Sequence, residues 1–174
     1  MLTLKGDAVF LRALEPTDLD FLYKLENDES VWEISETQTP YSRYVLKQYL
    51  DNSHKDIYEV KQLRLVISDF ENNLIGFVDL FDFNPKNNRA GVGIVVLEKE
   101  NRKKGIGTEA LRLLIDYSFR NLNLRQLYAN IGAKNEASIK LFSNLGFKKV
   151  GVKKDWNYIN SNYEDEILFQ KLNK

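Results

Sequence analysis

The segment Arg102-Lys103-Lys104-Gly105-Ile106-Gly107-Thr108 combines three basic side chains with two closely spaced glycines. The apolar run Ile94 to Leu97 precedes it, and a helix-like segment from Thr108 to Asn121 follows. Glycines let neighbouring backbone N–H groups converge on an anion, and the N-terminus of a helix adds partial positive charge. A strand, a basic glycine loop and a helix in this order therefore predict a phosphate-binding site.

Two constructions place glycines at the start of a helix. Gly105 to Ala110 formally match the dinucleotide fingerprint G-x-G-x-x-G/A, which follows a strand directly and needs an acidic residue about 20 positions later. Here seven residues, Glu98 to Lys104, separate the apolar run from the glycines. The next strand-like segment, Gln126 to Ile131, contains no carboxylate. A dinucleotide enzyme therefore remains only an alternative.

The second construction is R/Q-x-x-G-x-G/A, and Arg102, Gly105 and Gly107 satisfy it. At this point the sequence resembles the GNAT superfamily of acyl-CoA-dependent N-acetyltransferases, in which this loop binds the pyrophosphate of coenzyme A. Asn135-x-x-Ser138 followed by Leu145-Gly146-Phe147 resembles the second signature of that family, whose asparagine contacts coenzyme A. The resemblance implies acetyl-CoA as co-substrate.

Three shorter matches narrow the resemblance to one branch of the superfamily. That branch holds bacterial spermidine/spermine N-acetyltransferases and ribosomal-protein N-terminal acetyltransferases. The matches are Leu11-Arg12-Ala13-Leu14, Asn73-Leu74-Ile75-Gly76 and Asp116-Tyr117-Ser118-Phe119.

Composition limits the remaining classes of protein. The 174 residues fit one domain, residues 1–174, with a full core, and 25 basic against 25 acidic residues give no net charge to recruit nucleic acid or an anionic membrane. There is no cysteine, and His54 is the single histidine, so we expect no metal. The N-terminus lacks a signal-peptide core and no apolar run could span a bilayer, which predicts a cytoplasmic protein.

Hydrophobic periodicity and turn residues predict the order β-α-α-β-β-β-α-β-α-β-β, a single α/β domain with a mixed central sheet. The GNAT resemblance implies the same order. The predicted strands are Val9 to Leu14, Arg64 to Ser68, Leu74 to Phe83, Ala90 to Leu97, Leu127 to Ile131, Phe147 to Asn160 and Tyr163 to Leu172. Four helices are predicted. The first has Thr17 as its N-cap and the second starts near Ser42, whereas the third spans Thr108 to Asn121 and the fourth Asn135 to Leu145.

Details of these elements yield further expectations. The second helix should turn Tyr44, Val45, Tyr49 and Leu50 inward. Gly91 and Gly93 inside a strand indicate a bulge or a close backbone approach by a ligand. Exposed Trp156 and Tyr158 on the terminal hairpin make a homodimer possible.

The resemblance also implies how the thioester is held. The strand residues Ile94, Val95 and Val96 should splay from Leu127 to Ile131, with pantetheine in the gap and a strand amide directed at the thioester carbonyl. Phe142 would line the cofactor site, at a position where polyamine enzymes usually place a proton-donating tyrosine. Phenylalanine cannot donate a proton, so Ser138, four residues earlier on the same helical face, is the predicted donor. Tyr128 is an alternative.

A base must deprotonate the acceptor ammonium before it attacks. The candidates are Asp79, Glu33, Glu36 and a water chain, with His54 as a weaker choice. Asp79 interrupts an apolar strand, so it should either meet solvent in a cleft or pair with Arg64 or Arg89.

The acidic run from Glu26 to Glu36 would suit a cationic amine or form a solvated loop. We therefore expect an acetyl-CoA-dependent N-acetyltransferase acting on a polyamine or another small-molecule amine. A protein N-terminal acetyltransferase is the nearest alternative. Because Phe142 stands where relatives have the proton-donating tyrosine, a non-catalytic acyl-CoA-binding module is a further alternative. Because Gly91 stands where relatives often have an acidic residue, the acceptor could also be an amine other than a polyamine.

Overall fold

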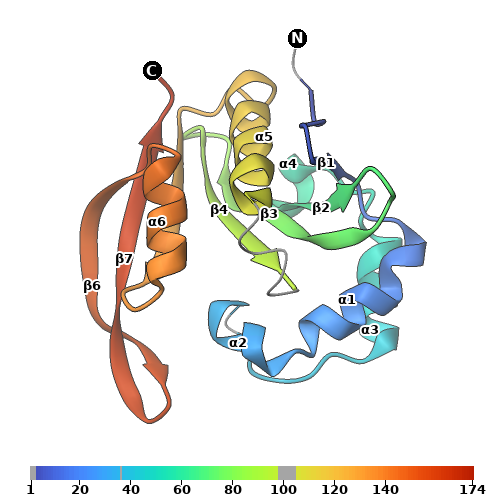
Figure 1. Ribbon diagram of the computed structural model, residues 1–174, viewed down its shortest axis with the longest axis horizontal. Coiled ribbons are helices and arrows are strands. Elements are labelled where there is room, and N and C mark those ends of the chain that lie inside the picture. Colours follow the sequence, from blue (N-terminus) through green and yellow to red (C-terminus); the bar gives the residue numbers. More distant parts are fainter. Residues whose placement is uncertain (1–2, 36, 98–104) are drawn as a thin grey trace.

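A computed structural model describes residues 3–35, 37–97 and 105–174. Over these residues the strands form one seven-stranded sheet in the order β1-β2-β3-β4-β5-β7-β6 (Figure 1). The strands are β1 (Val9–Arg12), β2 (Leu63–Asp69), β3 (Leu74–Asn84), β4 (Arg89–Val96), β5 (Gln126–Gly132), β6 (Lys148–Ile159) and β7 (Asn162–Leu172). The helices are η1 (Pro16–Asp18), α1 (Leu19–Glu26), α2 (Glu29–Ser35), α3 (Arg43–Asp51), α4 (Ile57–Val60), α5 (Ile106–Arg120) and α6 (Glu136–Asn144). The predicted order is confirmed, with η1, α2 and α4 as additions.

The sheet combines an antiparallel meander with one parallel crossover, both as predicted. Strands β2, β3 and β4 pair antiparallel in sequence, and β4, α5 and β5 form a βαβ unit with parallel strands. The parallel pairing joins only Arg89–Gly91 to Gln126–Tyr128. Since β4 continues to Val96 and β5 to Gly132, the described strands separate beyond this point. The predicted splay is therefore present in the fold.

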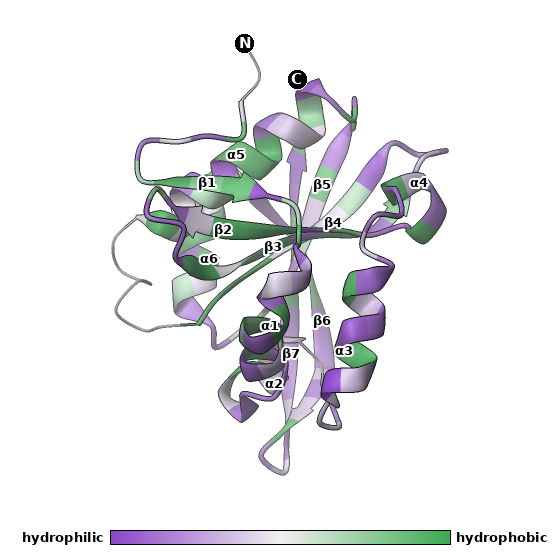
Figure 2. Ribbon diagram, turned by 90° about the vertical axis from the view of Figure 1, so that its right-hand side faces the viewer, coloured by the Kyte–Doolittle hydropathy of each residue, from purple (hydrophilic) through white to green (hydrophobic). Residues whose placement is uncertain are grey.

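Two hydrophobic cores form on opposite faces of the sheet. Helix α5 presents Ala110, Leu111 and Leu114 to the larger core, in the helical spacing that the sequence predicted. The smaller core packs Leu22 of α1 against Phe77 of β3. Strands β2 and β3 contribute to both cores and are largely hydrophobic (green in Figure 2). Helices α1, α2 and α3 gather away from α5 and α6 (Figure 1).

The first two predicted helices need correction in detail. Thr17 is not an N-cap, because it lies inside the short turn Pro16–Asp18. Asp18 precedes α1 and accepts a hydrogen bond from the Glu15 N–H at 2.8 Å. The start of α3 at Ser42 is confirmed, with the Val45 N–H donating to its hydroxyl at 3.2 Å.

The inward face of α3 agrees with the prediction at Tyr49 and Leu50, which pack against the smaller core, and differs from it at Tyr44 and Val45. Leu46 and Leu50 are buried, whereas Tyr44 is 70% exposed and Val45 is exposed. Leu46, Tyr49 and Leu50 have the i, i+3, i+4 spacing of one helical face, which lies further along the helix than the sequence indicated.

The two glycines of β4 have different surroundings. A Cβ at Gly91 would overlap the ring of Phe81, so a side chain of the chain itself, and no ligand, makes the close approach there. The bulge lies in β3, between Phe81 and Asn84, where Asp82 has a φ of 47°. At Gly93 a Cβ would meet only Phe81, at 3.9 Å, which leaves open space beside the strand.

Candidate functional site

The N-terminus of α5 faces the place where β4 and β5 separate. Gly105 precedes the helix with a φ of 75°, a left-handed conformation that glycine adopts without strain, and as a glycine it offers no side chain to cap the first turn. A Cβ at Gly107 would lie 3.5 Å from Ile94 of β4 and 3.6 Å from Leu141 of α6. Because the first N–H groups of a helix lack partners within it, a helix end whose N-cap residue is a glycine can bind an anion.

Glu109, in the first turn of α5, is held away from that end. Its carboxylate accepts hydrogen bonds from the backbone N–H groups of Asp7, Ala8 and Val9, at 3.0 Å for Ala8 and 3.1 Å for Val9. Backbone amides of the segment leading into β1 thus compensate the one acidic charge nearest the helix start. The sequence did not indicate this role, since the partner residues lie about a hundred positions away.

Of the other predicted cofactor residues that precede β5, some lie outside the described part of the chain and the rest lie on β4 and α5. Arg102, Lys103 and Lys104 lie outside the described residues. Ile94, Val95 and Val96 are half-buried in the separated part of β4, with Ile94 and Val96 packed against one core and Val95 against the other. Thr108 is half-buried in the first turn of α5.

Helix α6 contributes the second predicted signature. The Asn135 side chain accepts a hydrogen bond from the Ser138 N–H at 3.1 Å and so caps the helix. Ser138 is half-buried in the first turn. Phe142 is only 3% exposed, and its ring packs edge-on against Phe147 at 5.1 Å. The structure therefore places Phe142 in the core, and its contact with a cofactor stays a prediction.

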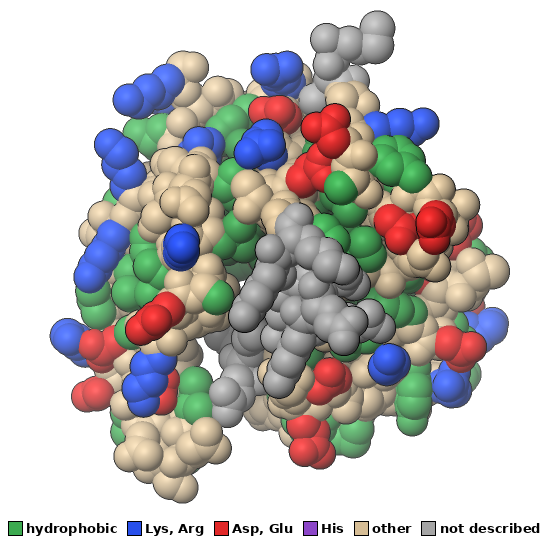
Figure 3. Space-filling model, viewed as in Figure 1, with side chains coloured by type: hydrophobic (Ala, Val, Ile, Leu, Met, Phe, Trp, Pro, Cys, Tyr) green, Lys and Arg blue, Asp and Glu red, His purple; other side chains and the backbone are tan. Residues whose placement is uncertain are grey.

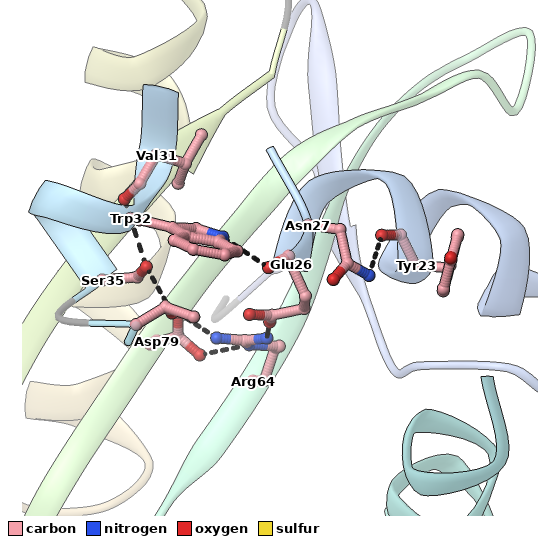
Figure 4. Close-up of polar contacts among 9 residues, drawn as sticks. Tyr23, Glu26, Asn27, Val31, Trp32, Ser35, Arg64 and Asp79 are labelled. Atoms are coloured by element: carbon pink, nitrogen blue, oxygen red, sulfur yellow. Dashed lines mark hydrogen bonds and ion pairs between the residues drawn. The ribbon is translucent and has the colours of Figure 1, made fainter. Parts of the chain in front are cut away.

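On the opposite face of the sheet, Asp79 has a partner. Its carboxylate accepts hydrogen bonds from Arg64 Nε at 2.7 Å and Nη2 at 3.3 Å, and Arg64 Nη1 pairs with Glu26 at 2.5 Å (Figure 4). Burial alone would lower the pKa of Arg64, but the charge and hydrogen bonds of Asp79 outweigh it and hold the pKa above its usual value. Pairing with Arg64 was one of the two predicted outcomes for Asp79, and its role as a base stays a prediction.

The acidic run is structured rather than a loop. Glu26 ends α1 and pairs with Arg64, and α2 follows at Glu29–Ser35. The Trp32 indole N–H donates to the Glu26 carbonyl at 2.9 Å, which ties α2 to the end of α1 (Figure 4). Glu33 belongs to α2 and Glu36 lies outside the described residues, so neither side chain is placed.

The alternative proton donor and base are also located. The Tyr128 hydroxyl donates to Asp82 at 3.2 Å, and burial together with this carboxylate raises the pKa of Tyr128 to about 12. Its ring packs edge-on against Phe81. His54 is exposed beside the C-terminal end of α3, with its ring nitrogen 3.0 Å from the Asp51 carbonyl oxygen.

Charged side chains of both signs are spread over the face in Figure 3, in keeping with zero net charge. Within residues 3–35, 37–97 and 105–174, no group of three or more His, Cys, Asp or Glu side chains could hold a metal ion. None of the helices in that part of the chain is long and apolar enough to cross a membrane.

A separated β4–β5 pair beside an uncapped helix N-terminus is the arrangement expected of an acyl-CoA-dependent acetyltransferase. Residues 8–148 match the model of the acetyltransferase (GNAT) domain, and the chain belongs to this family of N-acetyltransferases.

Similar proteins include spermidine N-acetyltransferases. The spermidine N(1)-acetyltransferase of Vibrio cholerae serotype O1 is 31% identical over 155 residues, which cover 89% of this chain and 87% of that protein. The Escherichia coli K12 enzyme is 32% identical over 160 residues, covering 92% and 83%. A crystal structure of the Vibrio cholerae enzyme in complex with CoA and spermine matches with a TM-score of 0.86 at 28% identity and covers 96% of each chain.

Proposed function

We propose that this N-acetyltransferase transfers the acetyl group of acetyl-CoA directly to a primary amine of a polyamine or another small-molecule amine. The observation that carries the proposal is the separation of β4 from β5 beside the uncapped start of α5. The similarity to spermidine N-acetyltransferases, one of them crystallised with CoA and spermine, supports both the cofactor and the acceptor class.

The cofactor would lie along α5 and the separated strands. The residues proposed to bind the pyrophosphate are Arg102, Lys103, Lys104, Gly105, Ile106, Gly107 and Thr108. Ile94, Val95 and Val96 would line the pantetheine arm, together with Asn135 and Phe142 from α6. Bound acetyl-CoA supplies an activated acetyl thioester. A backbone N–H of β4 aimed at its carbonyl oxygen would stabilise the transition state by about 3 kcal/mol.

Two proton transfers remain for the side chains. We propose that Ser138 returns a proton to the departing thiolate, directly or through water. Asp79 and Glu33 are proposed to remove the proton from the acceptor ammonium, Asp79 through water because Arg64 occupies its oxygens. Neither step requires a metal or a covalent enzyme intermediate. We place this activity in the cytoplasm, and a homodimer formed through the terminal hairpin stays a prediction.

The test is an acceptor panel. Purified protein is mixed with acetyl-CoA and spermidine, amino acids, aminoglycosides or short peptides, and thiol release is followed. Turnover with spermidine or another small amine is expected. Turnover confined to peptides would replace the proposal with a protein N-terminal acetyltransferase, and silence with every amine would contradict it.

A further inference from the structure

The terminal hairpin holds an ammonium group in a well-defined set of contacts. Lys153 of β6 forms an ion pair with Glu166 of β7, and its Nζ donates to the Asn130 side-chain oxygen of β5 at 3.3 Å. The same Nζ lies 4.5 Å from the centre of the Trp156 ring. A carboxylate, an amide oxygen and an aromatic face are the partners that any organic ammonium seeks. The structure therefore contains a complete ammonium site that its own lysine fills.

Both carboxylate oxygens of Glu166 have partners at this site. The residue is 6% exposed, and its second carboxylate oxygen accepts a hydrogen bond from Asn157 Nδ2 at 3.1 Å. A carboxylate buried to this extent needs a compensating cation, because an isolated buried charge is costly. Lys153 supplies that cation, so the pair as a whole is neutral.

The register of the sheet places this pair beside the separated strands. Tyr128 is the last β5 residue paired with β4, and Asn130 follows two positions later on the same face. Tyr128 packs against Phe81, which shares its face of β3 with Asp79. Ala129 and Ile131, which alternate with Tyr128 and Asn130 along β5, belong to the core that includes α5 and α6. Lys153 thus lies on the Asp79 face, opposite the face that carries α5 and α6.

We propose that Lys153 and Glu166 are specificity-determining residues that set how much positive charge the acceptor amine can carry. The inference rests on the proposed acetyl transfer to a small amine. A distal ammonium of a long polycation would compete with Lys153 for these contacts, and Glu166 balances the Lys153 charge. Lys153 therefore disfavours polycationic acceptors relative to singly charged amines, and Glu166 has the opposite effect.

Removing either charge tests the proposal because the two changes act in opposite directions. The measured quantity is the ratio of kcat/KM for spermidine to kcat/KM for octylamine, a single-ammonium chain. Lys153→Met should raise this ratio about tenfold, and Glu166→Gln should lower it about tenfold, as one unit charge acting across a partly dehydrated site requires. The double variant should return close to the native ratio.

Lys154→Met is the matched control. Lys154 neighbours Lys153 but pairs with Asp165 at 2.7 Å, and Asp165 alternates to the other face of β7 from Glu166. Its removal changes the net charge equally and should leave the ratio within twofold. An equal change in this control would show a non-specific charge effect and overturn the proposal.

The outcomes separate the two levels of inference. Native protein that acetylates spermidine, with ratios unchanged in both single variants, would overturn the specificity proposal alone. Native protein that acetylates no amine of the acceptor panel would contradict the proposed function instead, and native protein that acetylates other small amines but neither spermidine nor octylamine would overturn the specificity proposal. If Lys153→Met fails to fold, Glu166→Gln decides by itself, since an unchanged or raised ratio in that variant contradicts the proposal.

Discussion

Arg64 connects three elements through one guanidinium group. It binds Asp79 on β3 with two nitrogens and Glu26 at the end of α1 with the third, and it lies over the Phe77 ring. The side chain is 18% exposed, and its carboxylate partners are similarly covered. Removing a cation that two poorly hydrated carboxylates share strongly destabilises the fold, because both carboxylates are left unpaired.

Arg64→Met should therefore lower the free energy of unfolding by about 3 kcal/mol, the size expected when one partner of a buried ion pair is removed. Denaturant unfolding followed by circular dichroism measures this change. Arg43→Met is the control, since Arg43 also pairs with a carboxylate, Asp20, but is 53% exposed. The control should cost less than about 1 kcal/mol. Equal losses would show that burial of the Arg64 group adds nothing.

Ser138 is the residue on which the proposed proton return depends. Ser138→Ala should lower kcat about 100-fold, within the range for loss of a general acid, and leave the KM for acetyl-CoA within twofold. Steady-state thiol release gives both parameters. Ser143→Ala, an exposed change at the other end of α6, should alter neither. An unchanged kcat in Ser138→Ala would assign proton return to water or to another group.

At the scale of elements, long periodic segments were predictable and short ones were not. Helix α5 spans 15 residues and repeats its apolar spacing often enough to be recognised. Helices α2 and α4 have seven and four residues, too few for a helical period to stand out. The strands were found because glycine, asparagine and proline mark nearly every turn between them.

The site was predictable where a motif is local and not where it depends on packing. Gly105, Gly107 and Asn135 act through the backbone or a cap in their own segment, and the sequence located all three at helix starts. Gly91 was assigned a possible ligand contact because the sequence cannot show that Phe81 lies opposite it. The contact of Glu109 with β1 could not be predicted from the sequence either, since it joins segments that are 100 positions apart.

Substitutions can separate the capping role of Asn135 from its proposed role in coenzyme A binding. Asn135→Ala removes the cap of α6 and should cost about 1 kcal/mol, whereas Asn135→Ser keeps an acceptor oxygen and should cost only a few tenths. If the Asn135 amide also donates to coenzyme A, both variants should weaken coenzyme A binding about fivefold, the loss of one hydrogen bond. Thermal unfolding and calorimetric titration measure the two effects. Native affinity in Asn135→Ser would restrict the residue to capping.

Over the whole molecule, the start of α5 is a junction of segments from distant parts of the chain. The segment before β1 reaches it through Glu109, β4 through Ile94, and α6 through Leu141. A ligand bound at this junction contacts elements that separate on unfolding, so it should stabilise the fold as a unit. A dinucleotide site would instead be stabilised by NAD, so NAD is the comparison ligand for coenzyme A.

Coenzyme A at 100 times its Kd should add about 2.7 kcal/mol to the free energy of unfolding, which for a chain of this size raises Tm by roughly 5–10 °C. NAD at the same concentration should leave Tm unchanged, and the reverse pattern would contradict the proposed cofactor. Gly107→Ala refines the test, because its methyl group would sit in ordinary contact between Ile94 and Leu141. This variant should fold with near-native Tm, since alanine favours a helix, yet lose most of the coenzyme A shift as the methyl group crowds the backbone amides proposed to bind the pyrophosphate. A full shift in Gly107→Ala would place the cofactor elsewhere.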